Sequence, residues 1–121
     1  MPYICLVPES YDGKKVGTGE CVAFVQEAAS APNTSTWKKG AAVRGNLKIS
    51  KGTAIATFDS AGKYANLKTG NHAAIYVSQD GIGIWVYDQW RAQGAVLKRQ
   101  IRFKGGAGSP SNDGDAFSVI E

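Results

Sequence analysis

The sequence predicts an α+β protein in which one N-terminal helix packs on a central antiparallel sheet of about five strands. An apolar helical pattern runs from about Gly19 to Ser30. After it, short β-branched and aromatic runs alternate with glycine-rich and asparagine-rich segments up to the C-terminus. The length of 121 residues suits one domain spanning 1–121. A helix followed by a series of strands is the plan of α+β folds.

The first 19 residues precede the predicted helix. Residues 1–7 are apolar, and we expect them to form an edge strand or an extended arm. Residues 8–19 are mostly polar and contain several glycines, which predicts a loop. Cys5 lies in the apolar run, where a buried and unreactive thiol is expected.

The predicted helix carries the second cysteine close to its N-terminus. Thr18 is a suitable N-cap, and this would place Cys21 at the third helical position. Pro32 ends the helix. The following segment 38–50 contains two glycines and little periodicity, so we expect a loop there.

The strands are predicted from runs with high β-propensity between turn signals. Two of them surround the dipeptide Asp80-Gly81, which indicates a hairpin. Loops are expected at 59–71 and 105–115. The predicted strands cover residues 53–58, 72–78, 82–88, 95–103 and 116–120.

Composition and charge restrict the class of function. Hydrophobic residues make up 43% and charged residues 20%, which is enough apolar surface for a packed core. The net charge is +4, but the basic residues are scattered and no nucleic-acid-binding motif is present. A moderate positive charge also suits an anionic polymer such as the bacterial cell wall. We therefore expect no nucleic-acid partner.

The chain shows no feature of membrane insertion or of Sec export. No apolar run approaches the length of about 18 residues that crosses a bilayer. The N-terminal residues 1–10 are apolar but short, lack a basic segment, and contain Pro8 and Glu9. We expect no signal peptide and no membrane insertion, so that a protein acting outside the cytoplasm would need another route.

A thiol in the first turn of a helix is suited to nucleophilic chemistry. Cys21 follows the flexible stretch G-T-G-E, where unpaired backbone N–H groups and the helix dipole favour the thiolate. The thiolate is the reactive form of cysteine. His72, the single histidine, begins a predicted strand and could meet Cys21 across the helix–sheet interface as its base. Cys5, Cys21 and His72 are too few for a structural zinc site.

The residue that orients His72 follows from the register of the hairpin. A three-residue loop, with Gly81 in the left-handed conformation, would place Asp88 opposite His72 on the same face of the sheet. A two-residue loop would place Gln89 there instead. We expect Asp88 to orient the imidazole and keep Gln89 as the alternative.

Other residues are candidates for binding the reacting groups. The backbone N–H of Cys21 would form an oxyanion hole, with Tyr11 as a possible helper. Trp90 is expected near the substrate, and Trp37 is expected in the core or lining the cleft. The expected chemistry is attack on an amide carbonyl and hydrolysis of a thioester. It needs no metal and no organic cofactor.

At these motifs the chain resembles the NlpC and CHAP peptidoglycan amidases. The segment G-T-G-E-C-V-A-F-V-Q resembles their nucleophile segment, and K-G-T-A-I-A-T-F with G-N-H-A-A-I-Y-V resembles their strands. Over nearly its whole length the chain is similar to the type VI secretion amidase effectors. The resemblance implies a papain-like fold and hydrolysis of peptide bonds in peptidoglycan stems or crosslinks, with the crosslink slightly favoured.

The resemblance also implies a biological setting. Such effectors are toxins injected into the periplasm of a rival bacterium, and a cognate immunity protein plugs their cleft. Two alternatives stay open. The same chemistry would serve a phage endolysin or a self-directed wall-remodelling hydrolase, and a catalytically inactive module could bind wall peptide.

Overall fold

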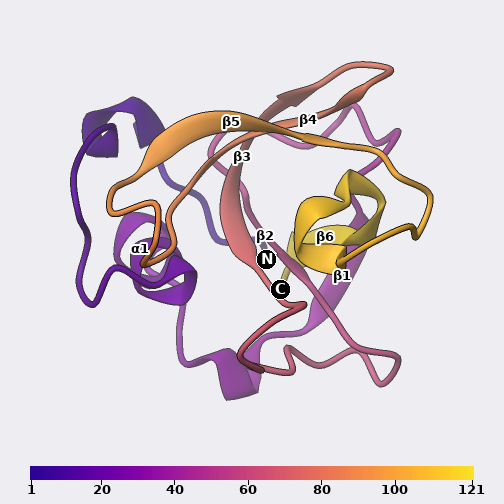
Figure 1. Cartoon of the computed structure of the whole chain (residues 1–121), viewed down its shortest axis with the longest axis horizontal. Helices are drawn as coiled ribbons and strands as arrows, with labels where there is room; N and C mark the ends of the chain where they lie inside the picture. Colours follow the sequence, from indigo (N-terminus) through magenta and orange to yellow (C-terminus); the bar gives the residue numbers. More distant parts are fainter.

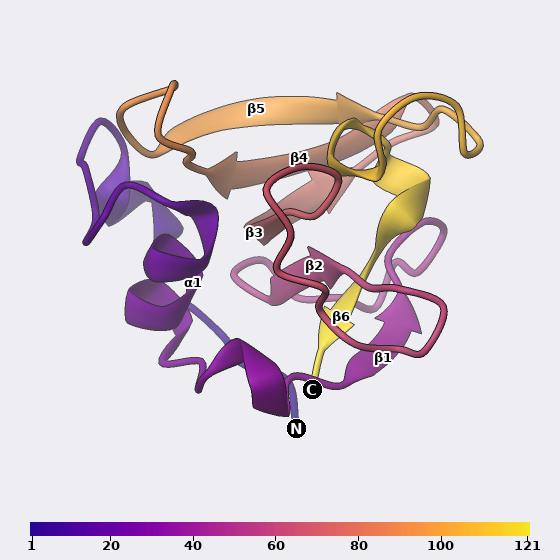
Figure 2. The same ribbon diagram turned by 60° about the horizontal axis from the view of Figure 1, so that its bottom comes forward.

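The protein has an α+β fold in which one α-helix packs on one antiparallel sheet. A computed structural model describes all residues, 1–121. The helix α1 (Cys21–Ala29) packs against β3 and covers one face of the sheet (Figures 1 and 2). The strand order is β1-β6-β2-β3-β4-β5. The strands are β1 (Lys39–Ala42), β2 (Ala54–Thr57), β3 (Ala73–Gln79), β4 (Gly83–Asp88), β5 (Leu97–Arg102) and β6 (Phe117–Ile120).

The sheet has six strands, so the expectation of about five was wrong. The missed strand is β1, which lies within the segment 38–50 that we expected to be a loop. It forms an edge of the sheet and pairs with β6, and the backbone of Lys38 exchanges two hydrogen bonds with that of Glu121. Most of its side chains are exposed, so no apolar alternation marks it in the sequence.

The N-terminal residues form the extended arm that the sequence predicts. The arm makes a single β-bridge, Ile4 to Thr53, and the Cys5 N–H donates to the carbonyl of Gly52 at 2.7 Å. Only 2% of Cys5 is exposed, and burial raises the pKa of its thiol. Within the predicted loop 8–19, a short 3-10 helix, η1 (Pro8–Tyr11), follows the arm.

The helix α1 begins later than the sequence predicts. Its N-cap is Glu20 rather than Thr18, so Cys21 occupies the first helical position instead of the third. Gly17 and Gly19 both have positive φ, of 54° and 87°, so the chain turns tightly and reaches helical geometry only after Gly19. The helix ends at Ser30, which adopts the left-handed conformation.

Both faces of the central strands are buried. On β2, Ala54 and Ala56 belong to the core cluster that contains Phe24 of α1, whereas Ile55 faces the opposite cluster with Phe117. The small alanine side chains on the helix side leave room for α1 against the sheet. All four residues of β2 are buried, and their side chains point alternately to the two clusters because a strand has a two-residue period.

The loop that connects β3 and β4 is longer than the predicted three residues. Pairing runs through Gln79↔Ile84 and Ile75↔Tyr87, with a bulge near Val77. Asp80 accepts the N–H groups of Ile82 and Gly83 and so closes a longer turn, and Gly81 does not have the predicted positive φ. The predicted pairing, in which His72 lies directly opposite Asp88, was therefore wrong by two positions.

The last loop packs beside the ends of β3 and β4. It contains two short 3-10 helices, η3 (Pro110–Asn112) and η4 (Gly114–Ala116). Asp113 holds it together, since its carboxylate accepts the backbone N–H groups of Lys104, Gly106 and Asp115. The two chain ends lie close together, and the N-terminal ammonium is 3.3 Å from a Glu121 carboxylate oxygen (Figure 2). The structure contains no helix with the length and apolarity needed to span a bilayer.

Candidate active site

The end of β4 lies beside the start of β3 because the two strands are antiparallel, and the N-terminus of α1 meets them there. His72 directly precedes β3, and Asp88 is the last residue of β4. Nε2 of His72 is 2.7 Å from Oδ2 of Asp88. Asp88 is completely buried and only 6% of His72 is exposed. A two-position change of register keeps both side chains on the same face, so they still meet.

The thiol of Cys21 lies at the other side of the imidazole. Its Sγ atom is 3.7 Å from the hydroxyl oxygen of Tyr64, and it interacts with the His72 side chain and the backbone of Ala73. Cys21 and His72 both line a cleft of about 650 Å³. A nucleophile and an imidazole thus lie at the wall of an open cleft, with the buried Asp88 carboxylate bonded to the imidazole.

The two reacting groups change each other's acidity. Burial of Cys21 opposes ionisation, but the hydrogen bond and charge of His72 outweigh it, so the pKa of Cys21 lies below its ordinary value. Burial also opposes protonation of His72. The hydrogen bonds to Asp88 and Cys21 outweigh this effect and raise the pKa of His72 to about 9. Each group therefore favours the charged form of the other, and the pairing favours a thiolate beside an imidazolium.

Asp88 has a second cationic partner that the sequence did not indicate. Nε of Arg99 donates to the same Oδ2 atom at 2.8 Å, while the buried Oδ1 atom has no partner within the protein. Arg99 comes from β5, where it pairs with Val86, so its side chain lies on the same face of the sheet as Asp88. The scattered basic residues of the sequence gave no reason to select Arg99.

Tyr64 is a further site residue that the sequence analysis missed. It lies in the loop 59–71 and receives a hydrogen bond from the Asn71 amide at 3.1 Å. Burial, followed by the nearby charge of Cys21, raises the pKa of Tyr64 well above its usual range, so its hydroxyl keeps its proton. A protonated hydroxyl can donate to the thiolate or to an oxygen of a bound substrate. No local motif marks a tyrosine in a loop for this position.

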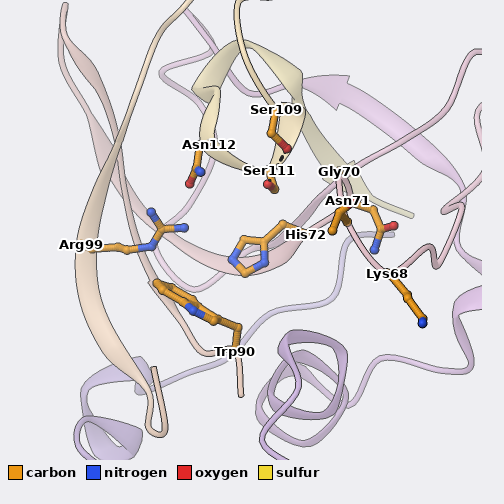
Figure 3. A pocket seen from close by; sticks show the side chains of 10 residues that line it. Lys68, Gly70, Asn71, His72, Trp90, Arg99, Ser109, Ser111 and Asn112 are labelled. Atoms are coloured by element: carbon orange, nitrogen blue, oxygen red, sulfur yellow. Dashed lines mark hydrogen bonds between the residues drawn. The ribbon is translucent and has the colours of Figure 1, made fainter. Parts of the chain in front are cut away.

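A second hollow of about 490 Å³ adjoins the cleft beyond His72 (Figure 3). The two hollows share Lys68, Asn71, His72 and Trp90. Trp90 is 37% exposed, and its ring lies edge-on to His72 with 6.2 Å between the ring centroids. Trp90 is therefore the predicted tryptophan that lies beside the reacting groups. No group of three or more potential ligand side chains is placed to hold a metal ion.

Comparisons with known proteins assign the chain to a family. The family model described as domesticated amidase effector 2 matches residues 2–120. The chain belongs to this family. It is 45% identical to a type VI secretion amidase effector 2 protein of Salmonella typhi, and the match covers both chains completely. It is 41% identical to domesticated amidase effector 2 of Ixodes scapularis, over 97% of this chain and 83% of that protein.

A solved structure supports the fold of the amidase effector 2 family for this chain. That structure is a type 6 secretion amidase effector 2 (Tae2) with 39% sequence identity and a TM-score of 0.86. The match covers 100% of this chain and 95% of the solved one. The overall fold is therefore shared with a solved relative.

Two predicted binding residues lie outside the cleft of this family member. Tyr11 packs edge-on against Phe24, with 5.5 Å between ring centroids, and lines a separate groove under the N-terminal arm. It cannot assist an oxyanion at Cys21, because η1 holds it against the middle of α1. Trp37 is 3% exposed and does not line either hollow. Its ring packs against Tyr64 and supports that residue from behind.

Gln89, the alternative orienting residue, makes no hydrogen bond with His72. Its buried side-chain amide accepts the N–H of Val16 at 3.1 Å and donates to the carbonyls of Val16 and Glu20. Glu20 is the residue before Cys21, so Gln89 fixes the loop that leads into α1. A residue that follows Asp88 on an alternating strand points to the other face, which explains this different contact.

We expect Gln89→Ala to destabilise the fold by about 3 kcal/mol, because it leaves three backbone groups without partners. Urea unfolding of the purified protein measures this change. Gln26→Ala is the matched control, since Gln26 makes one exposed hydrogen bond to Pro32 and its loss should cost under about 1 kcal/mol. Equal stability of the Gln89 variant and the wild type would contradict the expected anchoring.

We expect the two cysteines to react very differently with iodoacetamide. Cys21 should react fast at pH values below its ordinary pKa, because His72 lowers the pKa of the thiol. Cys5 should react only after unfolding, because it is buried and its pKa is raised. Mass spectrometry of the labelled peptides from pH 5 to 10 measures both rates. His72→Ala should shift the rate profile of Cys21 to higher pH, and an unshifted profile would contradict the ion pair.

Proposed function

We propose that this chain hydrolyses amide bonds in the peptides of bacterial peptidoglycan, with Cys21 as nucleophile, His72 as acid and base, and Asp88 as the orienting residue. The observation that carries the proposal is that Cys21 and His72 line the same cleft, while Nε2 of His72 lies 2.7 Å from the buried carboxylate of Asp88. The chain belongs to an amidase family, so amide hydrolysis is the reaction that this series would perform. We propose a papain-like single domain of the NlpC and CHAP type.

The first half of the reaction forms a thioester. The Cys21 thiolate attacks the amide carbonyl carbon, and the electron pair of the carbonyl moves onto its oxygen. When the carbonyl reforms, the carbon–nitrogen bond breaks and the protonated His72 gives its proton to the leaving amine. Asp88 holds the imidazole in the required tautomer and stabilises its charged form through the 2.7 Å contact.

The second half regenerates the thiolate. Neutral His72 takes a proton from water as the water oxygen attacks the thioester carbonyl. The carbon–sulfur bond then breaks, which releases the carboxylic acid portion of the substrate and restores the thiolate–imidazolium pair. One water molecule supplies the hydroxyl group of the acid product and the proton that replaces the one His72 gave to the amine.

The negative charge on the carbonyl oxygen needs hydrogen-bond donors during both steps. Cys21 is the first residue of α1, so its backbone N–H has no partner within the helix. Tyr64 offers a second donor, since its hydroxyl oxygen lies 3.7 Å from Sγ. We propose that these two donors form the oxyanion hole.

The names of the relatives support a specific biological setting. We propose that the chain is an antibacterial effector delivered by type VI secretion, which acts on the wall in the periplasm of the target bacterium. The producing cell would need protection, and a cognate immunity protein that fills the cleft of Cys21 is the proposed partner.

Digestion of isolated sacculi tests the proposed function. Incubation with the purified protein should release soluble fragments and create one new free amine for each amide bond cut. Mass spectrometry of the fragments identifies whether the crosslink or the stem is cleaved. Intact sacculi and unchanged muropeptides after prolonged incubation with folded protein would contradict the proposal.

A further inference from the structure

The hollow beyond His72 is lined by fewer hydrophobic residues than the cleft of Cys21. Ten residues line it, and only one of them is hydrophobic. The cleft holds Cys21 and Tyr64, whereas the hollow holds the side chain of Arg99 and residues Ser109, Ser111 and Asn112 of the last loop. His72 separates the two spaces, with the helix on one side and the last loop on the other (Figure 3). A substrate bound at Cys21 can therefore extend past His72 into polar surroundings.

Arg99 presents unused hydrogen-bond donors to this hollow. Its Nε atom binds Asp88, and its guanidinium carbon lies 4.8 Å from the centre of the Trp90 ring. The two terminal nitrogens make no hydrogen bond or ion pair within the protein. One bound edge and one stacked face fix the plane of the guanidinium, so its remaining edge is preorganised for a planar carboxylate.

The remaining donors and charges of the hollow favour the same ligand. Lys68 lines the hollow and makes no ion pair, and the side-chain amide of Asn112 has no protein partner. Ser109 and Ser111 share one hydrogen bond between their hydroxyl groups, 2.9 Å long. No acidic side chain lines the hollow, and Asp88 behind Arg99 is fully buried. The electrostatic potential in the hollow is therefore positive.

The proposed mechanism decides which part of the substrate reaches the hollow. His72 must protonate the leaving nitrogen, so that nitrogen lies on the His72 side of the attacked carbonyl. The portion of the substrate that carries the leaving amine then continues beyond His72. Where the amine donor of a peptidoglycan crosslink is diaminopimelate, the carbon next to this amine carries a carboxylate.

We infer that Arg99, assisted by Lys68, binds a free carboxylate on the amine-releasing portion of the substrate. This inference rests on the proposed amidase function and deepens it. The carboxylate would select crosslinks whose amine donor has an unblocked carboxyl group. It would act in the formation of the thioester only, because the amine portion has left before the thioester is hydrolysed.

A pair of synthetic peptides tests this inference. The two peptides contain the same scissile amide and differ only in the amine-side residue, which carries a carboxylate in one peptide and a carboxamide in the other. The wild type should cleave the carboxylate peptide about 10 to 100 times more efficiently in kcat/KM, as expected for a charge-assisted hydrogen bond to a half-buried group. Arg99→Gln should reduce this preference to about threefold or less, and Lys68→Gln should reduce it in part.

The preference within each variant is the decisive quantity, because Arg99 also contacts Asp88 and its loss will slow both peptides. Lys98→Gln is the matched control. Lys98 is the neighbour of Arg99 on β5, but its ammonium lies over the Trp85 ring and does not line the hollow. This control should keep the preference of the wild type. If Arg99→Gln is too slow, calorimetry on Cys21→Ala with and without Arg99→Gln measures binding of the two amine fragments.

The possible results test the carboxylate site and the proposed amidase function separately. If the wild type cleaves neither peptide, the proposed function fails. If it cleaves both with equal kcat/KM, the amidase function stands and the carboxylate site is wrong. A preference that persists in Arg99→Gln would also overturn the assignment, as would equal binding of both fragments to the Cys21→Ala proteins.

Discussion

Cys21→Ala is expected to lower amidase turnover by about 10⁴-fold or more, because the variant lacks the atom that forms the thioester. No other thiol can replace it, since Cys5 is buried under the N-terminal arm. The substitution is small and at a partly buried site, so the fold should persist. Release of fragments from sacculi measures turnover, and circular dichroism with a thermal melt checks the fold.

Cys21→Ser extends this test with a control close in shape. A hydroxyl lacks the low pKa that His72 gives to the thiol, so this variant should also be inactive while it still binds muropeptides. Turnover within about tenfold of the wild type in either variant would end the cysteine mechanism. Binding without turnover in the wild type itself would favour a wall-peptide-binding module instead of an enzyme.

Asp88→Asn is expected to lower kcat by about 10³- to 10⁴-fold while the cleft keeps its shape. An amide in place of the carboxylate no longer stabilises the imidazolium, so the pKa of His72 should fall from about 9. Arg99 would lose its charged partner inside the protein. Kinetics on muropeptides measures the rate, and NMR titration of His72 measures the pKa.

The same variant has a predicted dependence of stability on pH. The pKa of His72 in the folded protein lies above its ordinary value of 6.5, so its protonation stabilises the fold most below pH 6.5. This contribution is lost as the pH rises through about 9. The stability difference between wild type and Asp88→Asn should therefore shrink above that pH.

Asp80→Asn is the control for Asp88→Asn. Asp80 closes the hairpin turn through an oxygen that asparagine also has, and it lies at the far end of the same hairpin. Its activity should equal that of the wild type. An Asp88→Asn variant with nearly normal kcat and an unchanged His72 pKa would show that the 2.7 Å contact does not serve catalysis.

Patterns that depend on local periodicity were predictable from the sequence. The helix and most of the predicted strands carry buried apolar residues, and both faces are buried in β2 and in the first half of β3. The contact of His72 with Asp88 was also expected, although the assumed turn was wrong. Beyond the bulge, at the His72 end of the hairpin, the register error is two residues, and an even error leaves a side chain on the same face of the sheet.

Features that depend on contacts between distant segments were not predictable. β1 exists because β6 offers it a backbone partner, and its own side chains carry no strand signal. Tyr64 reaches the thiol from a loop without regular structure, and Arg99 reaches Asp88 only through the pairing of β4 with β5. Tyr11 and Trp37 were placed in the cleft by residue type, whereas packing against Phe24 and Tyr64 removes them from it.

A thiol at a helix start, a histidine at a strand start and a nearby carboxylate could be inferred from local patterns, because each is encoded within a few neighbouring residues. Their surroundings depend on how the chain packs: the first helical position of Cys21, the tyrosine beside it, and the arginine that joins the carboxylate to a polar hollow. Local patterns report which residues share an element and a face. Distances between elements are set by how the whole core packs, and that information is spread over the entire chain.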